Sequence, residues 1–169
     1  MADQDIIDEL VEQWRLERPD LGPDAYEAMA TIGRLTRIGL VLAPLIERVF
    51  TAHGLARGEF DVLATLRRQG APFVLTPTAM ARLLILSPGA MTNRLDRLEA
   101  AGHVQRAHDP DNRRSVLVTL TPAGRQLVDT ALEAHLTNEQ QLLSALGPAE
   151  RRRLDSALRR LLDTLASDA

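Results

Sequence analysis

The chain has 169 residues and a formal net charge of −3; it contains no cysteine, and all 20 of its basic residues are arginine. This length suits one domain with a sizeable core, and the absence of cysteine excludes disulfides, thiolate metal sites and thiol redox switches. The acidic N-terminus has no apolar signal core, and the most apolar run, residues 38–46, is far shorter than the ~20 residues of a membrane span, so we expect a cytoplasmic protein outside any membrane.

The N-terminal third of the chain predicts two helices. Residues 5–18 repeat apolar side chains at helical spacing, and Trp14, the only tryptophan, is expected to fix this helix to the core. Residues 24–53 form a longer helix that is apolar almost all round between positions 38 and 45. Such a helix must be covered on several sides.

The middle of the chain predicts three further helices. Residues 57–69 form the first, and a connector at 71–75, which can hold one short strand, leads to a helix that opens with Thr76-Pro77. The third opens with Ser87-Pro88, because serine is a good N-cap and proline has no N–H to leave unpaired at the first helical position. Gly102 can end this third helix in a left-handed conformation.

The helix at residues 87–101 presents two different faces. Met91, Leu95 and Leu98 share one face of the helical wheel. The opposite face carries small and polar side chains, with Arg97 at its flank: Gly89, Thr92, Asn93 and Asp96. A face of this kind can enter a major groove, where Asn, Thr and Arg read base edges, although an ordinary solvated helix face has the same composition.

A charged turn between two β-rich runs follows this helix. Residues 104–106 predict a short strand, residues 108–114 form a turn cluster that ends in Arg113 and Arg114, and residues 115–119 alternate as a second strand. Two helices and a hairpin with arginines at its tip make a winged helix-turn-helix. Arginines at such a tip reach phosphates or the minor groove beside the site that the helix reads.

Two C-terminal helices complete the predicted fold. Residues 122–146 and 149–166 have helical periodicity, and Gly147-Pro148 separates them. The leucine stripe of the last helix is too wide for a lone surface helix, so we expect the terminal helices to pair with those of a second copy.

Two stretches resemble the MarR family of bacterial transcription regulators: LSPGAMTNRLDRLEAAG at residues 86–102 and DNRRSVLVTLTPAG at residues 111–124. The resemblance covers nearly the whole chain. It implies a mainly α fold with a small β-wing, in one domain over residues 1–169. Within it, residues 5–53 would serve dimerisation and ligand binding, 54–120 would form the winged helix-turn-helix, and 121–169 would supply the C-terminal dimerisation helices.

The resemblance also implies a homodimer on a pseudo-palindromic operator in double-stranded DNA. The residues expected to contact DNA lie on the third central helix and at the wing tip: Ser87, Gly89, Thr92, Asn93, Arg97, Arg113 and Arg114.

Arg94 stands apart from these residues because the helical wheel places it beside Met91 and Leu98, on the inward edge. An unpaired buried guanidinium is costly, and Asp61 on the preceding helix is a natural partner. Two alternatives follow: the Asp61–Arg94 pair only orients two helices, or Arg94 also binds a small anionic ligand.

At four positions the sequence resembles a narrower, urate-responsive branch of the MarR family, the HucR and PecS type. They are Trp14, Asp61, Arg94 and Arg106. The resemblance implies that these four bind a small anionic effector, such as urate or an aromatic or organic acid, which releases a repressor from its operator.

No pattern in the sequence predicts catalysis. There is no Gly-rich phosphate loop, His-Glu-x-x-His motif or nucleophile elbow, and the four histidines lack ligand spacing. We therefore expect no enzyme activity, metal or cofactor. The alternative from another class is a winged helix that docks on proteins without DNA affinity, against which the outward-facing Thr92, Asn93 and Arg97 argue.

Overall fold

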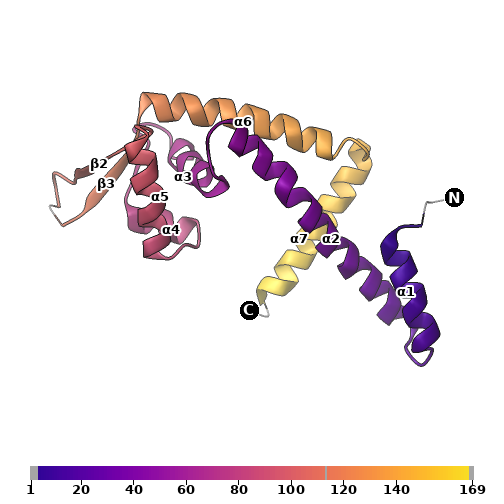
Figure 1. Cartoon of the computed structure of the whole chain (residues 1–169). Coiled ribbons are helices and arrows are strands. Elements are labelled where there is room, and N and C mark those ends of the chain that lie inside the picture. Colours follow the sequence, from indigo (N-terminus) through magenta and orange to yellow (C-terminus); the bar gives the residue numbers. More distant parts are fainter. Residues whose placement is uncertain (1–3, 113, 168–169) are drawn as a thin grey trace. The chain divides into compact units, whose positions relative to one another are not determined.

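The computed structural model describes residues 4–112 and 114–167, and the chain separates into two compact units (Figure 1). The first unit extends to Arg48 and the second begins at Val49, so helix α2 (Pro23–Ala52) contributes to both. Arg113, one of the two predicted wing-tip arginines, lies outside the described residues. The division into residues 5–53, 54–120 and 121–169 remains a prediction.

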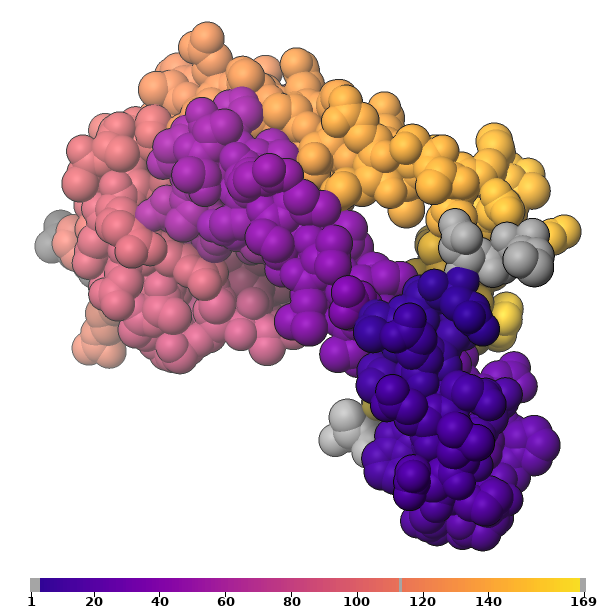
Figure 2. All heavy atoms as spheres, turned by 45° about the vertical axis from the view of Figure 1, so that its right-hand side comes forward, coloured from indigo at the N-terminus to yellow at the C-terminus, as the bar shows by residue number. Residues whose placement is uncertain are grey.

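In the first unit, α1 (Ile6–Glu17) packs along the first part of α2. Figure 2 shows the indigo atoms of α1 against the purple atoms of α2. The buried residues are Ile7, Val11 and Tyr26. Trp14, by contrast, is 50% exposed, so the prediction that it fixes α1 to the core is wrong within this unit. Tyr26 closes that end of α1: its hydroxyl donates to the carbonyl oxygen of Arg18 and its ring lies under the Arg15 guanidinium.

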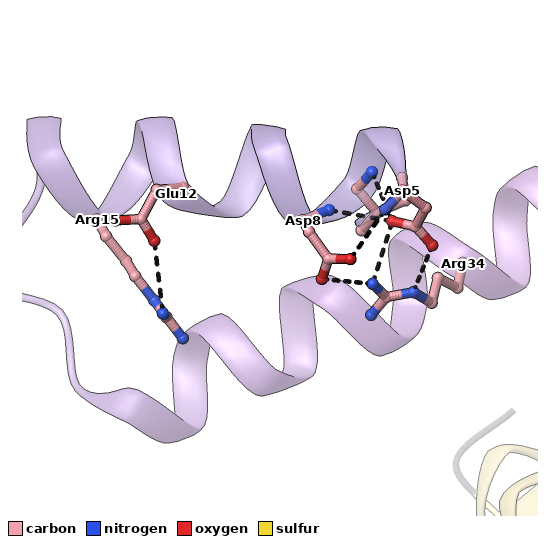
Figure 3. A network of polar contacts seen from close by, with 6 residues as sticks. Asp5, Asp8, Glu12, Arg15 and Arg34 are labelled. Carbon is pink, nitrogen blue, oxygen red and sulfur yellow. Dashed lines mark hydrogen bonds and ion pairs between the residues drawn. The ribbon is translucent and has the colours of Figure 1, made fainter. Parts of the chain in front are cut away.

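An ionic cluster joins the start of α1 to α2 (Figure 3). The Asp5 carboxylate caps α1 by accepting hydrogen bonds from the N–H groups of Ile7 and Asp8, at 2.9 and 3.1 Å. Arg34 of α2 donates to Asp5 at 2.8 Å and to Asp8 at 2.5 Å. The hydrogen bond from Arg34 is the main reason that the pKa of Asp5 is lowered to about 2. The predicted helix at residues 5–18 is therefore confirmed, with Asp5 as its N-cap.

The second unit contains a three-stranded antiparallel sheet of β1 (Val74–Leu75), β2 (Val104–His108) and β3 (Val116–Leu120), in the order β1-β3-β2. The wing, which we define as β2, β3 and the described residues between them (109–112 and 114–115), is the predicted hairpin, and Arg106 lies opposite Val118 in its register. β2 is an edge strand, so one side of it has no neighbouring strand.

Four helices of this unit occupy the stretches of the chain that the sequence predicts. They are α3 (Arg57–Arg68), α4 (Pro77–Leu83), α5 (Pro88–Ala100) and α6 (Pro122–Leu142). Three of them begin with a hydroxyl N-cap followed by proline: the side chains of Thr76, Ser87 and Thr121 each accept a backbone N–H of the first turn. Gly102 has φ +75°, as the predicted helix stop requires. The helix predicted at residues 122–146 ends earlier, at Leu142, where a turn begins.

The core of the second unit is mainly aliphatic, with Phe50 and Phe60 stacked within it. Met91, Leu95 and Leu98, the predicted inward face of α5, are each almost completely buried. They pack with α3 and the sheet, which contribute the buried Val62, Leu63, Leu66, Val104 and Val118. Burial of side chains of this size is worth roughly 1.5–3 kcal/mol each, so the core fixes which face of α5 points outward.

Two helices keep large apolar surfaces exposed in the single chain. α7 (Pro148–Ser167) buries no described residue, and five leucines along it are 36–64% exposed. α2 is long and apolar enough to cross a membrane, with a mean hydropathy of 1.4 over its most apolar 18 residues and none of that window buried. The apolar segment of α2 is therefore longer than the run at residues 38–46 that the sequence analysis considered. One such helix does not distinguish a membrane span from a helix covered by another protein chain.

The Asp5 cluster generates a pH prediction. A carboxylate whose pKa is depressed by folding stabilises the folded state above its unfolded pKa and loses that contribution as the pH falls. The contribution of Asp5 should therefore be complete above about pH 4 and should disappear towards pH 2. Methyl NMR signals of Ile7 and Val11 should report α1 loosening from α2 across this range.

Asp5→Asn should loosen α1 already at neutral pH and weaken the acid transition. Glu9→Gln, which removes a neighbouring exposed carboxylate of the same helix, is the matched control and should titrate like the parent chain. Identical titration curves for Asp5→Asn and the parent would show that Asp5 does not hold α1.

Candidate DNA-binding surface and its ionic contacts

The N-terminal half of α5 forms an exposed polar surface. Gly89, Thr92 and Asn93 are all exposed, while Met91 between them is buried. The Thr92 hydroxyl donates to the carbonyl oxygen of Pro88 at 3.0 Å and can still accept hydrogen bonds. This surface has side-chain types that can contact base edges in a major groove.

Arg97, at the flank of this surface, is held by α3. Its Nε lies 2.7 Å from Oε1 of Glu59. The other carboxylate oxygen of Glu59 accepts the N–H of Ala56, at 2.9 Å, and so caps α3. The Glu59 side chain is only 12% exposed. The Arg97 side chain is 63% exposed, so only one partner is shielded from solvent. The ion pair connects α5 to the first turn of α3.

Arg94 also points towards α3, on the inward edge that the helical wheel predicts, but it does not reach Asp61. Its guanidinium lies against Gly58, where a Cβ would sit 2.7 Å from Nε and 2.8 Å from Nη1. Only glycine leaves room for the guanidinium at this position. Within the part of the chain that the structure describes, no ion pair joins Arg94 to Asp61, so the predicted pair is not formed. The reason is geometric: the side chain lies one turn nearer the start of α3 than Asp61.

Arg106, on β2, lies between two carboxylates of α5. Its Nη1 is 2.7 Å from Asp96, and its Nε and Nη2 are 2.8 and 2.5 Å from Oε2 of Glu99. Its backbone N–H donates to Oε1 of Glu99 at 2.9 Å. These contacts raise the pKa of Arg106, chiefly through Glu99, and lower the pKa of Glu99, chiefly through Arg106. Both groups are therefore charged at neutral pH.

The wing tip exposes Arg114. Its backbone N–H donates to the side-chain oxygen of Asn112 at 3.2 Å, and the Asp109 N–H donates to the Ser115 carbonyl oxygen across the turn, at 3.0 Å. The side chain of Arg114 is exposed to solvent.

The predicted ligand residues fall into separate places. Trp14 belongs to the first unit, and Asp61, Arg94 and Arg106 belong to the second. Within the second unit, Arg94 contacts α3, whereas Arg106 contacts Asp96 and Glu99. A hollow of about 360 Å³ lies between α5 and the wing, and it is lined by Thr92, Leu95, Arg106 and His108 among others. Among the described residues, no group of three His, Asp or Glu side chains is placed to hold a metal ion.

Sequence reasoning missed the partners of these arginines: Gly58, Glu59, Asp96 and Glu99. A signal for two of them was present, because Asp96 and Glu99 are three residues apart and share one side of a helix. The helical wheel places Asp96 on the groove-facing surface, but in the structure its carboxylate pairs with Arg106.

The comparisons with known proteins agree with this architecture. The MarR family model matches residues 55–116. The HTH-type transcriptional regulator PecS of Dickeya dadantii is 39% identical over 155 residues, which cover 92% of each chain.

Two solved structures are similar over most of the second unit and beyond. One is a MarR mutant from Escherichia coli complexed with operator DNA, with a TM-score of 0.67, 26% identity, and coverage of 81% of this chain and 97% of that one. The other is Bordetella bronchiseptica BpsR, from a study of the regulation of its DNA binding by 6-hydroxynicotinic acid, with a TM-score of 0.65, 29% identity, and coverage of 78% and 93%. With its winged helix-turn-helix and a relative that matches almost its full length, the chain belongs to the MarR family.

Proposed function

We propose that the protein is a homodimeric transcriptional repressor that binds a pseudo-palindromic DNA operator and is released by a small, flat, anionic effector. The observation that carries the proposal is the exposed surface of Gly89, Thr92 and Asn93, held outward by a buried aliphatic core beside a wing that bears Arg114. The operator complex of the related E. coli protein supports the DNA target.

A dimer supplies the geometry for such an operator. Two recognition helices entering successive major grooves require half-site centres about one turn apart, ~34 Å or 10–10.5 bp. The exposed leucines of α7 and the exposed apolar residues of α2 are surfaces of the kind that a second copy covers. Coverage of α2 by a second copy would also explain its hydropathy without a membrane, and we propose a cytoplasmic location.

Arg94 supports an anionic effector. It lies over Gly58 in the first turn of α3, where Glu59 caps the helix and pairs with Arg97. In the described part of the chain Arg94 has no ion-pair partner. An anion there would be stabilised by its guanidinium. Among its relatives, BpsR is regulated by 6-hydroxynicotinic acid, a flat aromatic acid.

Release would follow from the position of Arg94 on the recognition helix. Because Asp61 is not its partner, the effector need not break an ion pair. An anion beside Gly58 would instead draw the guanidinium to a new position and shift α5 against α3. Coupling of ~1–3 kcal/mol is enough for a several-fold to hundredfold loss of DNA affinity. Asp61, on the same helix, would favour effectors of low negative charge, and Trp14 and Arg106 remain predicted contacts of the ligand.

DNA binding is tested by gel retardation with the DNA upstream of the protein's own gene. We expect retardation that weakens with rising salt. Asn93→Ala should relax sequence preference, by about 1–3 kcal/mol for a good base contact. Arg114→Ala should weaken binding to all sequences and lower the salt slope by about one.

The opposite result would support the protein-docking alternative. If no fragment is retarded even at low salt, where phosphate contacts are strongest, the chain is not a DNA-binding repressor.

The effector is tested by titrating urate, xanthine, salicylate, 6-hydroxynicotinate and an aliphatic tricarboxylate against the protein–DNA complex. We expect a flat aromatic anion to release the DNA. Arg94→Gln should need about tenfold more of it, because one charged hydrogen bond is lost. Arg82→Gln changes an exposed arginine of α4 and is the matched control. If every compound leaves the complex intact, or both variants respond like the parent, Arg94 is not an effector residue.

A further inference from the structure

The cluster of Arg106, Asp96 and Glu99 links the wing to the recognition helix. Arg106 is on β2, and the two acids are on consecutive turns of one side of α5. Four contacts of 2.5–2.9 Å connect them, three to Glu99 and one to Asp96. We call this cluster the wing clamp.

One contact of the clamp is a hydrogen bond from the backbone of β2, which pairs an N–H group at the edge of the sheet. β2 is at the edge of the sheet, so the N–H groups on its outer side have no strand to bind. The Arg106 N–H donates to Glu99 instead. Glu99 thus binds both the backbone and the side chain of one wing residue, which fixes the position of β2 along α5 as well as its distance from it.

The charges of the clamp also indicate a positioning role. Arg106 neutralises only one of the two carboxylates, so the clamp has a net charge of −1 on the helix that would enter the DNA groove. The Arg106 side chain is 29% exposed and Glu99 35%, which leaves the pair partly shielded from water. A negative charge beside DNA costs affinity, and its presence requires a compensating benefit.

We propose that Glu99 and Arg106 are positioning residues of the DNA interface: they hold the wing at a fixed place on the recognition helix, so that the wing tip and α5 meet DNA together. This inference rests on the proposed DNA binding. Its consequence is opposite to simple electrostatics, since removing the Glu99 carboxylate should weaken DNA binding although it removes a negative charge.

A direct role of Arg106 leads to a different expectation. If Arg106 bound a DNA phosphate by itself, Glu99 would compete with that phosphate, and loss of Glu99 would strengthen DNA binding. Removal of the Glu99 carboxylate should therefore weaken DNA binding if Arg106 positions the wing, and strengthen it if Arg106 binds phosphate directly.

The clamp can be tested first without DNA, by NMR hydrogen exchange at the Arg106 amide. Glu99→Ala should speed this exchange at least tenfold, because the N–H loses its acceptor. Asp96→Ala removes the same charge from the same helix but leaves that bond, and should keep the amide protected. Glu99→Gln retains an acceptor and should be intermediate. Unchanged protection in Glu99→Ala would overturn the clamp.

DNA affinity is then measured for the same variants over a salt series. Glu99→Ala should bind about 5–30-fold more weakly to operator and to unrelated DNA alike, with a salt slope lower by about one. Asp96→Ala removes the same charge but only one of the four clamp contacts, so it should lose less affinity than Glu99→Ala. Thermal unfolding followed by circular dichroism distinguishes a variant that folds poorly from one whose wing is misplaced.

Equal or tighter binding by folded Glu99→Ala would overturn the proposal. If the parent chain itself binds no DNA, the proposed function fails, whereas the exchange experiment still decides whether the clamp holds the wing.

Discussion

The position of α5 depends on the burial of Met91, Leu95 and Leu98 against α3 and the sheet. This apolar contact fixes which side of the helix faces outward, but apolar packing alone tolerates small shifts along and around the axis. Ionic contacts at both ends of the surface remove that freedom. Glu59 holds Arg97 on the side of α3, and Arg106 holds Asp96 and Glu99 on the side of the wing.

The arginines near α5 thus differ in their contacts, although the sequence does not distinguish them. Arg97 and Arg106 have carboxylate partners within 2.7 Å or less, while Arg94 lies over a glycine and Arg114 is in solvent. In an acidic chain, this distribution matters more than the net charge. A partly shielded carboxylate fixes the direction of the arginine that it pairs with. Such an arginine is better suited to position a helix than to bind phosphate.

The sequence predicted the local structure well, because the signals for it are local. Thr76-Pro77, Ser87-Pro88 and Thr121-Pro122 each start a helix, Gly102 ends α5, and alternation at Val116, Val118 and Leu120 makes a strand. The partners of side chains were harder to predict. Asp61 has the right charge for Arg94, but the choice between Asp61 and the space above Gly58 depends on how α3 and α5 cross. Trp14 has the right spacing for burial, but Tyr26 fills the space at that end of α1. Such outcomes depend on tertiary packing, which helical periodicity does not contain.

A double-mutant cycle between Glu59 and Arg97 tests whether carboxylates position the recognition helix. Operator affinity would be measured for Glu59→Gln, Arg97→Gln and the double variant, each checked for an unchanged melting temperature. We expect Glu59→Gln to weaken binding despite the loss of a negative charge, and the two substitutions to couple by about 0.5–3 kcal/mol. Tighter binding by Glu59→Gln, with additive effects of the two substitutions, would contradict this expectation, because Arg97 would then act on DNA independently of α3.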